Sequence, residues 1–275
     1  MLKRALKVAV AISLLSSTSV FADAISDAVN NEHRPNNQKM RDEYRNPQQT
    51  LRFFDIQPNM AVAEISPGGG WYSNILAPLL KDKGQYYAAH FYLYEGAPSY
   101  YPRLLDGFNK TLTTHPDYTN VKITAFHHSK ALDFAPAGSL DRVLSFRNVH
   151  SWYGDDGKKG IEQAFSSFAK ALKQGGIVGV VAHKLPESAS DNLQNNSGYI
   201  KQSVVVAAAK EAGLTLLAQS DVNLNLADTA DHERGVWTLP PSLSLGEKDR
   251  AKYLSIGEST RMTLKFVKPK LKTKE

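Results

Sequence analysis

Short apolar runs alternate along the chain with longer segments whose apolar residues have helical spacing. The runs typical of strands are Ala61–Ile65, residues 84–92, Val121–Phe126, Arg142–Phe146, Ile177–His183, Leu214–Ser220 and Met262–Val267. The segments typical of helices are Gln48–Phe54, Trp71–Leu80, Ser99–Leu112, Ile161–Leu172 and Ile200–Ala212. This alternation predicts an α/β fold with a doubly wound, mostly parallel sheet of seven strands and helices on both faces.

The first 22 residues have the pattern of a secretory signal peptide. Three basic residues precede the apolar run Val8–Leu15, and Val20 and Ala22 place small side chains before the expected cleavage point. The apolar run is too short to span a bilayer. We therefore expect cleavage after Ala22, a periplasmic or secreted protein, and no stable membrane anchor once the signal is removed. A short N-terminal anchor is the alternative interpretation.

The remaining chain suits one large domain, which we place at residues 48–269. Residues 23–47 are polar and read as an N-terminal arm, residues 221–260 as an insertion without clear periodicity, and residues 270–275 as a basic tail. The formal net charge of +6 comes from the leader and the lysine-rich C-terminal end, so the body of the chain is near neutral. This distribution argues against a nucleic-acid partner.

Three consecutive glycines stand between the first expected strand and the helix that follows it. Glu64 ends the apolar run, and Ser66, Gly68, Gly69 and Gly70 follow. Glycine lets the backbone approach a ligand closely, and a helix N-terminus offers free N–H groups. The alternative is a plain tight turn, which a single glycine could form. We predict a ligand cradle here.

Polar and aromatic residues follow the fourth expected strand. Arg147, Asn148, His150 and Trp152 should face the glycine turn, because ligands bind where the strand order of an open sheet reverses. His150 is the candidate general base, and Asn148 and Arg147 are candidate catalytic residues beside it. The alternative is that Arg147 and Asn148 cap a helix and that Trp152 packs in the core.

Three further side chains are candidates for substrate contacts. Tyr72 directly follows the glycines, and the insertion holds His232 and Trp237, so we expect these residues, with Trp152, to contact a substrate. A surface flap anchored by Trp237 is the alternative. Histidines also fall at the ends of expected strands, at His90, His127 or His128, His150 and His183. They lack the spacing of a known metal motif, so we assign no metal ligand.

The sequence resembles class I S-adenosylmethionine-dependent methyltransferases, and among them the exported bacterial proteins described as predicted methyltransferases. The resemblance covers Gln48–Pro269 and is most specific in "EISPGGGWY", "LSFRNVHSWY", "DHERGVWTLPP" and "RMTLKFVKP". It implies that S-adenosylmethionine binds to Glu64, Ser66 and the three glycines. Ser66 stands where the family has its first glycine, and His90 stands near the usual ribose-binding acid, with Glu95 the nearest carboxylate.

The resulting hypothesis is an exported methyltransferase that acts on an unknown small-molecule acceptor. The alternative is a non-catalytic periplasmic ligand-binding protein that retains the methyltransferase fold, favoured by the residues at Ser66 and His90. A hydrolase or metal enzyme built on the histidines is a third hypothesis. The sequence predicts no oligomeric state.

Overall fold

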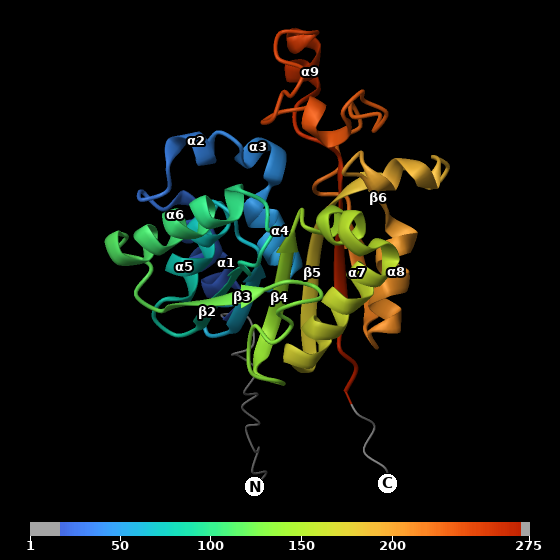
Figure 1. Ribbon diagram of the computed structural model, residues 1–275. Coiled ribbons are helices and arrows are strands. Elements are labelled where there is room, and N and C mark those ends of the chain that lie inside the picture. Colours follow the sequence, from blue (N-terminus) through green and yellow to red (C-terminus); the bar gives the residue numbers. More distant parts are fainter. Residues whose placement is uncertain (1–16, 271–275) are drawn as a thin grey trace, which may run out of the picture.

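A mixed β-sheet forms the centre of the computed structural model, which describes residues 17–270 (Figure 1). The strands run in the order β3-β2-β1-β4-β5-β8-β7, and β6 pairs with the end of β5. Their bounds are β1 Ala61–Ile65, β2 Gln85–Phe91, β3 Val121–Phe126, β4 Leu140–Phe146, β5 Leu172–Leu185, β6 Ile200–Lys201, β7 Thr215–Ser220 and β8 Arg261–Val267. Only β8 runs antiparallel to its neighbours, β5 and β7. The predicted doubly wound sheet is confirmed, with the two-residue β6 in addition.

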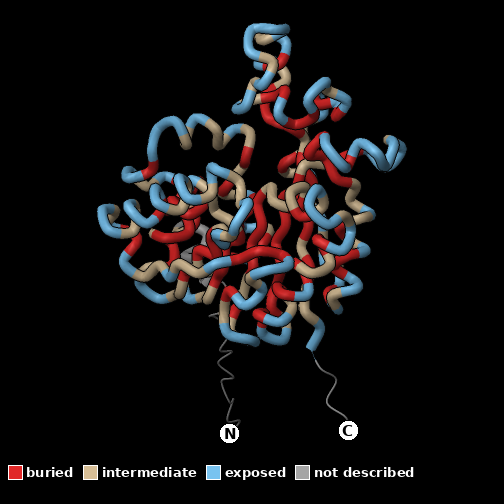
Figure 2. Tube along the Cα trace, in the orientation of Figure 1, coloured by how far each residue is buried: buried red, intermediate tan, exposed pale blue. Residues whose placement is uncertain are grey.

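Helices cover both faces of the sheet because the strand residues alternate between two apolar cores. Val62 faces a core shared with α1 Ser17–Asn30, α4 Pro47–Phe53, α5 Ser73–Leu80 and α6 Tyr100–Thr114. Ala63 and Ile65 face a second core shared with α7 Val149–Ala171 and α8 Gln202–Glu211. The apolar residues of both cores recur with the spacing expected for strands and helices. Figure 2 shows the buried residues concentrated in the central strands.

The helix expected at Ile161–Leu172 begins twelve residues earlier than predicted, because α7 starts at Val149. The helix is broken at Asp156 and Gly157, where Gly157 takes a φ of 61° and a ψ of −144° that favour glycine. Gly160 then packs so closely that a Cβ there would lie 2.1 Å from the carbonyl oxygen of Trp152. The acidic and glycine residues near this break interrupt the apolar spacing, so the first two turns of α7 could not be recognised from the sequence.

The segment that the sequence marks as a polar arm packs onto the domain. Ile25, Ala28 and Val29 of α1 are buried against the core of α4 and α5. Two short helices follow, α2 Asn36–Lys39 and α3 Asp42–Arg45. They lie beyond the carboxyl ends of the parallel strands (Figure 1). This placement makes the arm a wall of the region where ligands bind in such sheets.

The insertion lies beyond the same end of the sheet, next to α2 and α3 (Figure 1). It contains the 3₁₀ turn η2 Gly235–Thr238 and the helix α9 Arg250–Ile256, and a further turn, η1 Asp191–Asn195, precedes β6. Most of the expected leader and of the basic tail lies outside the described residues, and the expected cleavage point after Ala22 falls within α1. Within residues 17–270, no helix has the length and apolar character needed to cross a bilayer.

Candidate functional site

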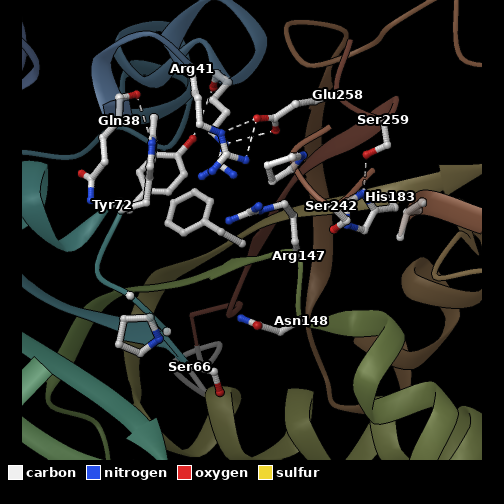
Figure 3. Close-up of a pocket in the computed structure, with 18 of the residues that line it drawn as sticks. Gln38, Arg41, Ser66, Tyr72, Arg147, Asn148, His183, Ser242, Glu258 and Ser259 are labelled. Carbon is white, nitrogen blue, oxygen red and sulfur yellow. Dashed lines mark hydrogen bonds and ion pairs between the residues drawn. The ribbon is translucent and has the colours of Figure 1, made fainter. Parts of the chain in front are cut away.

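A cavity of about 660 Å³ lies at the carboxyl ends of the central strands. Its volume is typical of a site for a small molecule or cofactor. Its walls come from four parts of the chain: α2 and α3, the glycine turn after β1, the ends of β4 and β5, and the segment between β7 and β8. Figure 3 shows side chains from these parts converging on one space.

The glycine turn exposes its backbone to this cavity. Gly68 and Gly69 line the cavity, and a Cβ built on either residue meets no atom within 4 Å. Ser66, Gly68 and Gly70 have φ values of 49°, 59° and 77°, a region that glycine adopts readily. The nitrogen of Ser66 also donates to the carbonyl oxygen of Ala89 at 2.8 Å, which ties the turn to β2. A plain tight turn would not need two adjacent glycines open to a cavity.

Glu64 is a buried carboxylate on the wall beside the turn. Its Oε2 accepts hydrogen bonds from Ser73 Oγ at 2.9 Å and from Tyr86 Oη at 2.5 Å. Burial raises the pKa of Glu64 to about 7, although these two bonds act in the opposite direction. Its Oε1 has no hydrogen-bond partner among the described residues and is the oxygen left for a ligand.

His90 does not take the ribose-binding position that the sequence suggested. The side chain is fully buried and does not line the cavity. Its Nδ1 accepts a hydrogen bond from the Phe91 nitrogen at 2.9 Å, so Nε2 carries the proton and donates to the carbonyl oxygen of Gly68 at 3.1 Å. Both ring nitrogens are therefore used within the protein, and His90 holds the glycine turn against β2.

The turn after β4 brings Arg147 and Asn148 to the cavity. Arg147 has a φ of 65°, and its nitrogen donates to the carbonyl oxygen of Val181 at 2.7 Å. Asn148 Nδ2 donates to the carbonyl oxygen of Ile65 at 2.7 Å, which joins the ends of β4 and β1. Asn148 is also the residue before the first turn of α7. Asn148 makes no side-chain cap hydrogen bond to α7, so the capping interpretation is not supported, and both residues line the cavity.

Two histidines meet on the opposite side of the cavity. The ring centroids of His150 and His183 are 5.5 Å apart, and Trp237 lies edge-on to His150 at 5.9 Å. His183 Nδ1 lies 2.5 Å from Ser259 Oγ, whereas the ring of His150 has no hydrogen bond to the described residues. Burial, with Arg147 nearby, lowers the pKa of His150 to about 4. Both imidazoles are neutral at pH 7, because burial also lowers the pKa of His183 well below its usual value.

Of the four residues expected to contact a substrate, two line the cavity and two do not. Tyr72 and Trp237 line the cavity, and the Tyr72 ring stacks on Phe146 with centroids 3.5 Å apart. Trp152 instead packs edge-on against core phenylalanines and borders only a smaller neighbouring cavity. His232 pairs with Asp228 at 2.9 Å and does not line the cavity. For Trp152 the core interpretation is thus the better one, and His232 supports the insertion.

The sequence analysis missed an arginine cluster on the cavity wall. Arg41, the residue before α3, Arg45 at the end of α3 and Arg261 of β8 form ion pairs with Glu258. The pKa of Arg45 is lowered to about 9, mainly by burial and next by the positive charge of Arg147. Arg147 therefore belongs to the same group of arginines. The spacing of four residues between Arg41 and Arg45 was the one local signal, because within a helix it would place both side chains on one face.

A second cavity of about 170 Å³ adjoins the first and shares Ser66, Phe91, Arg147, Asn148 and His150 with it. Aromatic and histidine side chains from the end of β3 and the start of α6 also line it, namely Tyr100, Tyr101, Phe126, His127 and His128, and Ser151, Trp152 and Asp155 of α7 complete the lining. The two cavities together could hold a ligand that extends to both sides of the Ser66 turn.

Two of the strand-end histidines lie close to an acid in the second cavity. Ligand atoms of His127, His128 and Asp155 lie within 4.8 Å of one another. However, His127 Nδ1 accepts a hydrogen bond from the Ser129 nitrogen at 3.1 Å, which leaves the proton on Nε2, and His128 Nε2 pairs with Asp156 at 2.8 Å. A metal ligand needs a free nitrogen lone pair. The bond from Ser129 uses the Nδ1 lone pair of His127, whereas the bond to Asp156 leaves Nδ1 of His128 free, 4.0 Å from Asp155, so His127 alone is held in a form unsuited to a metal.

No protein-family model and no curated protein sequence matches the chain. Solved structures do share its architecture. The [4+2]-cyclase SpnF aligns with a TM-score of 0.55 at 12% identity, over 82% of this chain and 81% of that one. A SAM-dependent methyltransferase from Aquifex aeolicus aligns with a TM-score of 0.50 at 16% identity, over 72% of this chain and 93% of that one.

A third structure, described as a possible exported protein from Bordetella parapertussis, aligns with a TM-score of 0.51 at 15% identity. The alignment covers 90% of this chain and 79% of that one. At such low identities the likeness concerns the fold, and one of these proteins is named as a cyclase. The chain therefore has the Rossmann-like fold of class I S-adenosylmethionine-dependent methyltransferases.

Proposed function

We propose that this chain is an exported methyltransferase that uses S-adenosylmethionine to methylate a small molecule. The observation that carries the proposal is the glycine turn, because the backbone of Gly68 and Gly69 is open to a cavity at the end of β1. In this fold that position is where a cofactor meets the backbone. The export part rests on the residue pattern of Met1–Ala22.

The residues of the cavity fit most of this cofactor. The glycine backbone and the free Oε1 of Glu64 would take its amino-acid end, and the aromatic second cavity would take its adenine ring. The end of β2 offers no carboxylate for the ribose, and His90 is fully engaged. The Ser66 hydroxyl borders both cavities and has no hydrogen-bond partner among the described residues, so we assign the ribose contact to it.

When bound, S-adenosylmethionine supplies an activated methyl group. The residues of the chain would mainly hold the acceptor in line with it and exclude water. Neutral His150 can accept a hydrogen bond from the acceptor and orient its lone pair, while Trp237 and Tyr72 limit the space. With a pKa of about 4, His150 is a weak base at neutral pH, so we assign it orientation rather than proton removal.

A non-catalytic ligand-binding protein is the second candidate, and the missing acid at the end of β2 favours it. Calorimetric titration of residues 23–275 with S-adenosylmethionine and S-adenosylhomocysteine tests the choice. Gly68→Val should abolish binding, because a branched side chain would enter the cavity. The matched control is Gly138→Val, since Gly138 also has a positive φ, 66°, and open space around it but lies outside the cavity. Both variants strain the backbone alike.

Binding by the native chain and by Gly138→Val, with none by Gly68→Val, supports the cradle. Equal binding by both variants would show that the three glycines form a turn and do not contact the ligand. If the native chain binds neither compound, the methyltransferase proposal fails and the binding-protein candidate replaces it.

A further inference from the structure

Three arginines already saturate Glu258 on the cavity wall. Arg41 Nε donates to its Oε1 at 2.7 Å, and Arg45 Nε donates to its Oε2 at 3.2 Å. Arg261 Nη1 lies 3.5 Å from the same Oε2. One negative charge therefore faces three positive charges, and neither carboxylate oxygen is left without a partner.

A fourth arginine, Arg147, is not bonded to Glu258 and only feels its charge at a distance. The guanidinium of Arg147 makes no hydrogen bond or ion pair with any residue that the structure describes, although it lines the cavity. Figure 3 shows it in the open space below the Arg41–Glu258 pair, on the side of Tyr72. Arg45 offers no second open donor, because its Nη1 is buried and its guanidinium lies 4.6 Å from the centroid of the Trp71 ring.

The remaining acid of the cavity does not neutralise this charge. Glu64 is the other carboxylate in the lining, and its raised pKa leaves it only partly ionised at neutral pH. Burial also lowers the pKa of Arg147 to about 10, an effect that Arg261 increases. Burying a cation without a counter-charge is costly, so a protein that keeps one facing a cavity has a site for an anion.

We propose that the methyl acceptor carries an oxoanion, a carboxylate or a phosphate, which binds to the guanidinium of Arg147. A guanidinium presents paired N–H groups that match two oxygens of such a group. The anion site itself does not depend on the proposed function; only its assignment to the methyl acceptor does. The same chemistry could also come from the carboxylate of the cofactor, and the experiment separates these two sources.

The probe is inorganic phosphate, titrated calorimetrically into residues 23–275 at constant ionic strength set with sodium chloride. Arg147→Gln should weaken phosphate binding by at least about tenfold, because it removes a charge-assisted hydrogen bond. Arg147→Lys keeps the charge but loses the paired donors, so its loss should be smaller. Arg250→Gln is the control, since Arg250 lies on α9 outside the cavity.

Folding of the variants is checked by thermal unfolding without phosphate. Arg147→Gln should be at least as stable as the native chain, because the guanidinium has no bond to the described residues and its removal relieves repulsion from Arg261. A lower midpoint for this variant would mean that Arg147 has an internal partner, and that result would overturn the proposal. Phosphate binding that is equal in the native chain and in Arg147→Gln would overturn it as well.

A second titration is made with saturating S-adenosylhomocysteine. Phosphate affinity that changes by less than about twofold assigns the site to the acceptor. Competition between the two compounds assigns it to the cofactor carboxylate and overturns the acceptor inference. If S-adenosylhomocysteine does not bind while phosphate binds through Arg147, the proposed function fails and the anion site itself is supported.

Discussion

Replacing Glu64 by glutamine should make the stability of the protein less sensitive to pH. The folded protein holds the Glu64 proton up to a pKa of about 7, whereas the unfolded chain releases it near 4.5. Between these values the folded state binds more protons, so the free energy of unfolding falls as the pH rises. The gap corresponds to about 3 kcal/mol. Glutamine keeps the oxygen that accepts bonds from Ser73 and Tyr86 but carries no charge.

The assay is urea unfolding of residues 23–275 at pH 5, 6, 7 and 8, followed by circular dichroism. The native chain should lose about 2.5 kcal/mol more than Glu64→Gln between pH 5 and pH 8. Comparing the two pH profiles cancels the contribution of all other groups. Glu211→Gln serves as the control, because Glu211 is exposed on α8 and its replacement should leave the profile unchanged. Parallel profiles for the native chain and Glu64→Gln would refute the reasoning and show that Glu64 ionises as an exposed acid does.

Two further predictions concern the arginine cluster and the leader. Glu258→Gln should lower the free energy of unfolding by about 3 kcal/mol and the Tm by about 10 °C, because three arginines lose their counter-charge; a Tm within 1 °C of the native value in thermal unfolding would contradict this. Export predicts an N-terminus at Asp23, which amino-terminal sequencing of the protein from the periplasm or medium checks; recovery of unprocessed chain from the cytoplasm alone would refute it.

The strands and most helices could be predicted because their signals are local. The buried runs at Ala61–Ile65 and Arg142–Phe146 need only their own apolar residues to be recognised, and the glycines after β1 mark a turn whatever packs against it. The first turns of α7 were missed for an equally local reason. Gly154, Asp156 and Gly157 interrupt the apolar spacing there, and at Asp156 and Gly157 the backbone itself leaves the helical conformation.

The site was harder to predict because its chemistry depends on contacts between distant segments. His90 stands where a ribose-binding acid is expected, but the carbonyl of Gly68 uses its Nε2, and no sequence pattern reveals that bond. The arginine cluster draws on α3, β4 and β8. In the sequence Arg41 belongs to a polar N-terminal arm, and only the fold shows that Glu258 lies beside it.

The pairing of Arg41 with Glu258 also has a consequence for folding order. The two residues are 217 positions apart, and Arg45 and Glu258 are 213 apart, so this wall of the cavity joins the two ends of the chain. Contacts between such distant residues form late, because a long loop must close first. The sheet and the glycine turn can assemble before the cavity is complete. Ligand binding would then report that the N-terminal arm and the segment before β8 have both reached the sheet, since each supplies a wall of the cavity.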